Sequence, residues 1–253
     1  MFASYVALFV SALLAGAVNS VAGGGTLLTF PTLLSMGVTP LAANATSAIA
    51  LIPGSFGAFW GYRRSLVGSR RTLLEFGVPS VVGGAIGALL ASRVGDARFR
   101  AIVPWLIFGA TALFVAQGPI RAWLWKRSGE ARTPETTPAI AMFFQLAVAI
   151  YGGFFGAGIG ILMLATLGLL GFTDIHRMNG VKNFAAVCIN LAATITFVRL
   201  GLVRWPLALI MAAGAIVGGY SGAGIAKRVG ERNVRRMVVA VGVTIGVVMV
   251  VRR

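Results

Sequence analysis

Long apolar runs, separated by short breaks that carry most of the basic residues, constrain this chain more than any other feature. A helix needs about 20 apolar residues to cross the hydrocarbon layer of a membrane, and most of the runs approach that length. They extend approximately over 2–22, 26–37, 44–62, 73–92, 101–118, 139–157, 159–171, 184–198, 205–226 and 237–251. Only 11% of the 253 residues are charged. The pattern predicts an all-α integral membrane protein and excludes a soluble enzyme, a disordered chain and a disulfide scaffold.

The charge balance is strongly basic, with 22 Lys and Arg against 6 Asp and Glu and a net charge of +16. In a soluble domain this excess would indicate nucleic-acid binding. Here the basic residues lie in the short breaks, where they fit loops resting on anionic headgroups. We therefore expect membrane lipids, and no nucleic acid, as partners of these residues.

The chemistry available for catalysis or metal binding is sparse. The sequence has one His, one Cys (Cys188) and no HExxH, CxxC or Walker motif. None of the six acids clearly falls in the middle of an apolar run. Asp96 and Glu231, beside basic residues at the ends of runs, are expected to be helix caps or local ion-pair groups. The sequence predicts no metal, no cofactor and no enzymatic activity.

The chain also repeats itself at a shift of 135 residues. At this shift 83–87 falls on 218–222, and Asn44 falls on Asn179. Near the start of each half the shift is one or two residues smaller, and 22–26 meets 156–160. We interpret 1–118 and 139–253 as two transmembrane repeats of about five helical segments each. A basic, proline-containing linker over 119–138 joins them.

Counting charges gives the relative orientation of the repeats. With five segments in each half, 15 of the 22 basic residues fall on one side of the membrane. With each glycine-interrupted pair counted as one span, the split is 12 against 10. The positive-inside rule favours the first arrangement. It predicts inverted repeats with both termini outside the cytoplasm. Ten crossings and six crossings plus two re-entrant hairpins have the same parity, and both remain open.

Two short apolar runs, 26–37 and 159–171, directly follow glycine clusters. Glycine-rich broken segments within inverted repeats are typical of secondary transporters. Non-helical backbone is stable inside a membrane only where it lines protein or a water-filled cavity. We therefore expect the breaks at 19–26 and 152–160, together with 39–47 and 173–183, to form a site.

The residue types at these breaks favour an anion. Glycines expose backbone N–H groups, a following helix directs the positive end of its dipole at the gap, and Asn, Ser and Thr add neutral donors. Lys182 adds a charge, and no carboxylate lies within one helical turn of it. The predicted backbone donors are Gly23, Gly24, Gly25, Gly156 and Gly158. The predicted side-chain groups are Asn19, Ser20, Thr26, Asn44, Thr46, Ser47, Asn179, Asn183 and Lys182.

Each of these features also has a purely structural interpretation. Glycine pairs at GxxxG spacing indicate close helix packing, which we expect for Gly57/Gly61, Gly83/Gly87 and Gly218/Gly222. Lys182 at an interface would extend toward the headgroups. Asn44 and Asn179 are alternatively helix caps, and Asn190 is alternatively an interhelical hydrogen-bonding residue.

Four stretches, taken in order and spacing, resemble the sulfite exporter TauE/SafE family, also called the 4-toluene sulfonate uptake permeases. They are residues 16–31, 44–47, 178–183 and 218–223, and the resemblance covers nearly the whole chain. It implies a multi-pass inner-membrane protein of two related halves that moves sulfur-containing anions. The second half departs from the pattern, because it has Gly156-Ala-Gly158 in place of three consecutive glycines.

The function predicted from residues and resemblance together is secondary transport. The expected substrate is a small anion, either sulfite or an organosulfonate, moved across the inner membrane by alternating access. The alternatives are an anion channel and a non-transporting structural subunit. Exposed GxxxG faces also permit a homodimer.

Overall fold

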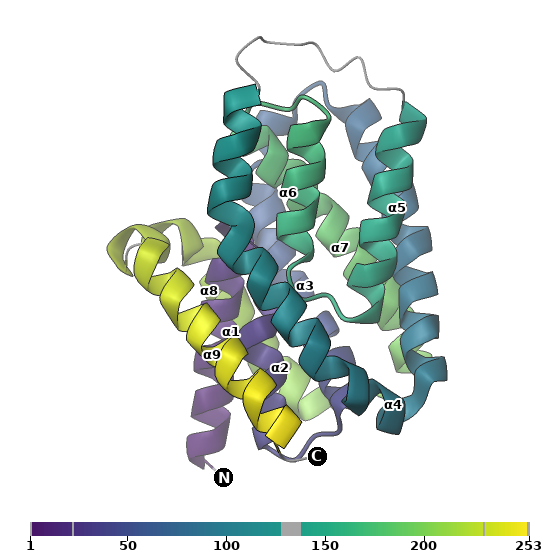
Figure 1. The fold of residues 1–253 in the computed structure, drawn as a ribbon, viewed down its shortest axis with the longest axis vertical. Coiled ribbons are helices and arrows are strands. Elements are labelled where there is room, and N and C mark those ends of the chain that lie inside the picture. The colour runs from purple at the N-terminus through teal and green to yellow at the C-terminus, as the bar shows by residue number, and fades with distance from the viewer. Residues whose placement is uncertain (1, 22, 128–137, 230, 252–253) are drawn as a thin grey trace.

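The fold is built from helices, as the apolar runs predict. We describe residues 2–21, 23–127, 138–229 and 231–251 in a computed structural model (Figure 1). The elements in these ranges are α1 (Phe2–Val21), α2 (Thr26–Ser35), α3 (Pro40–Gly61), the 3-10 helix η1 (Arg63–Leu66), α4 (Arg70–Arg127), α5 (Pro138–Phe154), α6 (Ile159–Leu169), α7 (Ile175–Arg199), α8 (Trp205–Val229) and α9 (Glu231–Val251).

Several of these helices are suited to a membrane. Within the described residues, four helical stretches are long and apolar enough to cross it: Ala3–Ser20, Pro40–Gly61, Arg70–Ala116 and Ile175–Arg199. The third has 47 residues, about 70 Å of helix, which exceeds twice the thickness of the hydrocarbon core. Gly95 interrupts it with non-helical angles (φ 75°, ψ 163°). The two apolar runs predicted on either side of this point are therefore two arms of one bent helix.

Figure 1 shows this bend of α4 near the bottom of the view, with both arms rising from it. The start of α1 and the end of α9 lie at that same end of the molecule (Figure 1). The second arm of α4 continues to Arg127, so helix extends into the segment predicted as a linker.

The start of α3 is tied to the bend of α4. Asp96, next to the non-helical Gly95, accepts a hydrogen bond from the backbone N–H of Leu41 at 2.9 Å. Pro40 opens α3 and has no N–H, so Leu41 is the first residue of α3 with an N–H that needs an acceptor. The prediction of Asp96 as a capping group is confirmed. The side chain of Glu231 lies outside the described residues.

The two predicted helix breaks are present. α1 ends at Val21 and α2 begins at Thr26, while α5 ends at Phe154 and α6 begins at Ile159. The backbone between them enters the left-handed region at Gly23 (φ 81°), Gly24 (φ 116°), Gly156 (φ 78°) and Gly158 (φ 79°). Only glycine adopts this region without strain, so the glycine clusters determine where the helices stop. With 10 and 11 residues, α2 and α6 are too short to span the hydrocarbon layer.

Glycine faces bring the long helices into backbone contact. α1 packs along α8, α4 packs along α5, and α3 packs against α7 and α8. A Cβ on Gly87 would overlap the carbonyl of Ile150 in α5, and a Cβ on Gly218 would overlap the carbonyl of Leu13 in α1. The packing predicted for Gly83/Gly87 and Gly218 is therefore confirmed; Gly222 lies outside the residues whose surroundings are described.

The same prediction was wrong for Gly57 and Gly61. A Cβ on either would meet no atom within 4 Å in the described part of the chain. They lie on an outer face of α3 beside Phe56 and Trp60, whose side chains are exposed. GxxxG spacing identifies a smooth helix face, but it does not establish that another helix of the same chain covers that face.

Replacing Gly87 with Ala should therefore be destabilising, whereas Gly57→Ala should not. The added methyl group at 87 forces α4 and α5 apart, at a cost of about 1–3 kcal/mol, while the methyl group at 57 enters open space. Thermal unfolding of the two purified variants in detergent measures the difference. Equal melting temperatures would refute the close α4–α5 contact.

Candidate functional site

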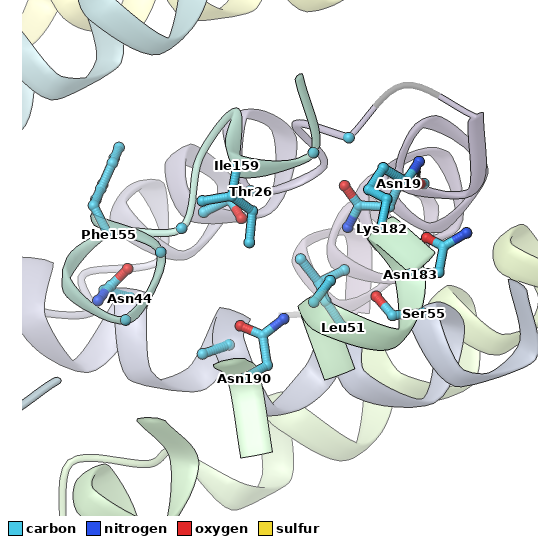
Figure 2. Close-up of a pocket in the computed structure, with 17 residues that line it drawn as sticks. Asn19, Thr26, Asn44, Leu51, Ser55, Phe155, Ile159, Lys182, Asn183 and Asn190 are labelled. Carbon is cyan, nitrogen blue, oxygen red and sulfur yellow. Dashed lines mark hydrogen bonds between the residues drawn. The ribbon is translucent and has the colours of Figure 1, made fainter. Parts of the chain in front are cut away.

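A pocket lies where the two helix breaks come together (Figure 2). Its cavity volume is about 30 Å³, and it is partly open to the surroundings. Its walls come from α1, α2, α3, α5, α6 and α7 and from the two breaks. The lining residues are Asn19, Gly23, Thr26, Asn44, Ala48, Leu51, Ser55, Gly152, Gly153, Phe155, Gly156, Ile159, Gly160, Lys182, Asn183, Ala186 and Asn190.

The two breaks touch backbone to backbone. A Cβ on Gly23 would lie 2.5 Å from the Cα of Gly160, the second residue of α6. A Cβ on Gly156 would lie 3.9 Å from the Oγ1 of Thr26, the first residue of α2. Each short helix therefore starts against the break of the other half, and the pocket forms around this crossing point.

Asn19, in the last turn of α1, caps the start of α2. Its Oδ1 accepts hydrogen bonds from the backbone N–H groups of Gly24 at 3.0 Å and Gly25 at 2.7 Å. These are donors that the helix itself leaves without partners. The backbone donors predicted at Gly24 and Gly25 are thus bound within the protein in this conformation.

Lys182 is the charged residue of the pocket. It lies two turns into α7 and is only 1% exposed. Its Nζ donates to the backbone carbonyl of Asn19 at 3.1 Å. This carbonyl belongs to the last turn of α1, where the helix dipole concentrates partial negative charge. The ion pair found among the described residues joins Arg71 to Glu75, and its Arg71 side chain is exposed. Lys182 takes no part in it. The ammonium of Lys182 is therefore met by a neutral oxygen and by no carboxylate of this part of the chain.

A parallel hydrogen bond closes the other break. Asn44 in α3 donates from its Nδ2 to the carbonyl of Phe154, the last residue of α5, at 3.0 Å. The two acceptor carbonyls have similar places, because Phe154 ends α5 and Asn19 lies in the last turn of α1. In both cases a side chain from a long helix of one half of the chain binds a backbone carbonyl in the last turn of a helix of the other half: Lys182 binds α1, and Asn44 binds α5.

Asn183 adds a donor without a partner. The residue is 1% exposed, and its Nδ2 is buried with no hydrogen bond among the described residues. Figure 2 shows Asn183 beside Lys182, on the side of the pocket where Asn19 and Ser55 also lie. A buried N–H group without an acceptor is costly, so a ligand oxygen at this place would satisfy it.

Half of the predicted site residues line the pocket: Asn19, Gly23, Thr26, Asn44, Gly156, Lys182 and Asn183. The others do not. Ser20 donates to the carbonyl of Ala17, Asn179 donates to that of Ile175, and Thr46 accepts from the N–H of Arg204 just before α8. Ser47 is buried with its hydroxyl unpartnered, and Gly158 forms the left-handed turn that starts α6.

Sequence reasoning missed the apolar walls and one hydroxyl. Ala48, Leu51 and Ser55 continue from Asn44 along α3 at helical spacing, and Ala186 and Asn190 continue from Lys182 and Asn183 along α7. Extending each predicted polar position by three, four, seven and eleven residues along its helix would have found them. Phe155 and Ile159 carried no such signal.

Groups suited to a metal are absent from the described residues. No cluster of three His, Cys, Asp or Glu side chains forms there. Asp174, the acid closest in sequence to the predicted site, caps α7 by accepting from the N–H of His176 at 2.9 Å. The donor set of the pocket, an ammonium with amide and hydroxyl groups, suits an oxyanion.

Membrane-suited helices interrupted around a buried, lysine-bearing pocket define a multi-pass membrane protein of the transporter class. The family model for the sulfite exporter TauE/SafE matches residues 8–249, and the chain belongs to this family. It is a membrane transporter of that family.

Relatives of similar length carry similar descriptions. The chain is 30% identical over 244 residues to the "Probable membrane transporter protein ORF9" of Sinorhizobium sp, covering 95% of this chain and 90% of the relative. It is 31% identical over 239 residues to a "Probable membrane transporter protein" of Haemophilus influenzae, with coverage of 92% and 89%. It is 30% identical over 238 residues to the "Probable membrane transporter protein YfcA" of Escherichia coli K12, with coverage of 92% and 85%. No solved structure matches the chain.

The contact between the breaks can be tested by Gly23→Ala, with Gly37→Ala as a matched control. Both glycines have φ near 80°, but a Cβ on Gly37 meets nothing within 4 Å. The control should lose about 1–2 kcal/mol from the left-handed conformation alone. Gly23→Ala should lose clearly more, because the methyl group overlaps the Gly160 backbone. Thermal unfolding in detergent measures both, and equal losses would mean that the breaks do not touch.

Proposed function

We propose that this protein is a secondary transporter that moves a small anion, either sulfite or an organosulfonate, by alternating access. The observation that carries the proposal is the buried ammonium of Lys182, which lacks a carboxylate partner among the described residues and lies beside the unpartnered amide of Asn183. A charge buried within a membrane protein is costly unless it is paired. A bound anion would supply the missing negative charge.

The rest of the pocket narrows the class of anion. The amide of Asn183 and the hydroxyl of Ser55 suit the several oxygens of an oxyanion. Leu51, Phe155 and Ile159 add an apolar wall that would accept a short organic substituent. The choice of sulfur rests on the family description, since the pocket chemistry suits other oxyanions as well.

We also propose that the halves, 1–118 and 139–253, are inverted repeats with α2 and α6 as re-entrant helices. The helix contacts support this, because corresponding helices make corresponding contacts across the two halves. α1 of the first half packs along α8 of the second, and α5 of the second half packs along α4 of the first. At finer scale, Gly84 contacts Ile189 and Gly219 contacts Gly54. Each pair is related to the other by the 135-residue shift. Rocking of one half against the other would open the pocket to alternate sides.

The orientation proposed is that of an inner-membrane protein with both termini outside the cytoplasm. Arg63, Arg64, Arg70 and Arg71, around η1 and the start of α4, would then face the cytoplasm, as the positive-inside rule requires.

Single-cysteine labelling tests this orientation. In a Cys188→Ala background, Ser4→Cys reports on the start of α1 and Val67→Cys reports on the basic end; both positions are exposed. A membrane-impermeant maleimide added to intact cells should label Cys introduced at 4 and not at 67. Inside-out vesicles should give the opposite result. Labelling of 67 from outside would reverse the proposed topology.

Transport itself is tested by Lys182→Met, with Arg64→Met as the matched control. Both changes remove one positive charge, but Arg64 is exposed. In proteoliposomes, uptake of radiolabelled sulfite or methanesulfonate should fall at least about tenfold for Lys182→Met, since a charge-assisted contact is worth about 1.5–3 kcal/mol. It should be nearly unchanged for Arg64→Met. Undiminished uptake by folded Lys182→Met would remove Lys182 from the mechanism.

The same assay separates the alternatives. A carrier gives uptake that saturates with substrate, a channel gives flux that does not, and a structural subunit gives none when purified alone. We expect saturation. An enzymatic role is not expected, because the pocket offers no acid, base or metal cluster among the residues described.

A further inference from the structure

We propose that Asn19 is an internal competitor of the transported anion, holding by its own oxygens the donors that the anion must engage. This inference rests on the proposed function. It concerns the conformation described here, in which Asn19 binds two kinds of donor. One is the ammonium of Lys182, which lines the pocket; the other is the pair of amides of Gly24 and Gly25, which lie in sequence between the lining residues Gly23 and Thr26 but do not line the pocket themselves.

Asn19 accepts hydrogen bonds through both its side chain and its backbone carbonyl. Its Oδ1 accepts from the N–H groups of Gly24 and Gly25, at 3.0 Å and 2.7 Å. Its backbone carbonyl accepts from Lys182 Nζ at 3.1 Å. Oxygens of an oxyanion bridging the same groups would make similar contacts. They would make them more strongly, because hydrogen bonds to a charged acceptor are about twice as strong as neutral ones.

The second observation that points to a ligand is Asn183. Asn183 lines the pocket beside Lys182 (Figure 2), and its Nδ2 is buried and unpartnered in the described chain. Asn19 therefore satisfies some of the donors at this place and leaves one unsatisfied. A purely structural hydrogen-bond network would be expected to satisfy all of these donors. Leaving one of them without an acceptor is what we expect where Asn19 occupies part of the place of a bound ligand.

The other break supplies a contrast within the same molecule. At the shift of 134 residues that aligns the two breaks, Gly153 is the counterpart of Asn19 and has no side chain to act as a cap. Among the described residues, the amide of Gly156 donates to the backbone carbonyl of Tyr151, and no side chain accepts from the amides before α6. The fold therefore forms a helix break without such a cap. The side-chain oxygen at position 19 is an addition specific to the break that faces the lysine.

Competition would couple binding to the shape of the break. When an anion takes the amides of Gly24 and Gly25, Asn19 is released and the start of α2 is held by the substrate in place of α1. The connection between α1 and α2 then depends on occupancy, which is what a gate at this position requires.

The primary test compares Asn19→Ala with Asn190→Ala by isothermal titration of the purified protein with sulfite and with methanesulfonate. Asn190 also lines the pocket but caps no helix. Asn19→Ala removes the side-chain oxygen and frees the amides of Gly24 and Gly25, while the backbone carbonyl that binds Lys182 remains. The apparent Kd equals the intrinsic Kd divided by the populated fraction of the binding-competent state, so the Kd should fall by about three- to tenfold. Asn190→Ala removes a polar group of the pocket without freeing any donor, so it should raise the Kd.

A purely structural cap predicts the reverse for Asn19→Ala, namely lower stability with an unchanged or higher Kd, and that result would overturn the inference. Should Asn19→Ala fail to fold, NMR of wild-type protein labelled with 15N at its glycines distinguishes the competitor role from the structural cap. Sulfite should move the amide signals of Gly24 and Gly25 downfield and leave that of Gly37 in place. Static signals at 24 and 25 with sulfite bound would also overturn it.

The two proposals fail separately. Wild-type protein that binds neither sulfite nor methanesulfonate refutes the proposed function. Wild-type protein that binds them with the same Kd as Asn19→Ala refutes only the competitor role.

Discussion

The hydrogen bond from Lys182 to the carbonyl of Asn19 is the interaction on which the rest of this site depends. A buried ammonium in a membrane protein needs an acceptor, and the backbone of an intact helix offers none, because its carbonyls bind its own N–H groups. The acceptor exists here because α1 stops at Val21. The left-handed glycines that end the helix and the lysine that uses the freed carbonyl are therefore one structural unit. Without the break in α1, Lys182 would lack this acceptor.

The two breaks are chemically unequal, although their backbones correspond. An ammonium binds the last turn of α1, whereas the neutral amide of Asn44 binds the last turn of α5. The pocket consequently has a charged side near Asn19 and Lys182 and a more apolar side near Phe155 and Ile159 (Figure 2). Two similar helix breaks thus form an asymmetric pocket. On the proposed function, a substrate with a charged head and a small apolar group would have one favoured direction within it.

The sequence predicted those parts of the structure that rest on rare residues. Glycine clusters located the breaks, because few other residues adopt positive φ, and Lys182 was conspicuous because charge is scarce in the apolar runs. The apolar walls were not predictable in this way, since Leu51 or Phe155 looks like any lipid-facing residue in a chain that is 58% hydrophobic. Nor could spacing separate Gly87, which touches α5, from Gly57, which touches nothing. The bond from Asn19 to amides five and six residues onward follows no short-range capping pattern.

Helix geometry and electrostatics are coupled at residue 19. Straightening α1 through the break would return the Asn19 carbonyl to an intrahelical bond and strip Lys182 of its acceptor, so the break cannot close while the lysine remains charged and unpaired. An anion beside Lys182 removes that obstacle, because it replaces the carbonyl as the partner. On the proposed function, the anion that binds beside Lys182 would therefore also permit α1 and α2 to change their relative geometry. Binding and movement at this break would then depend on the same interaction.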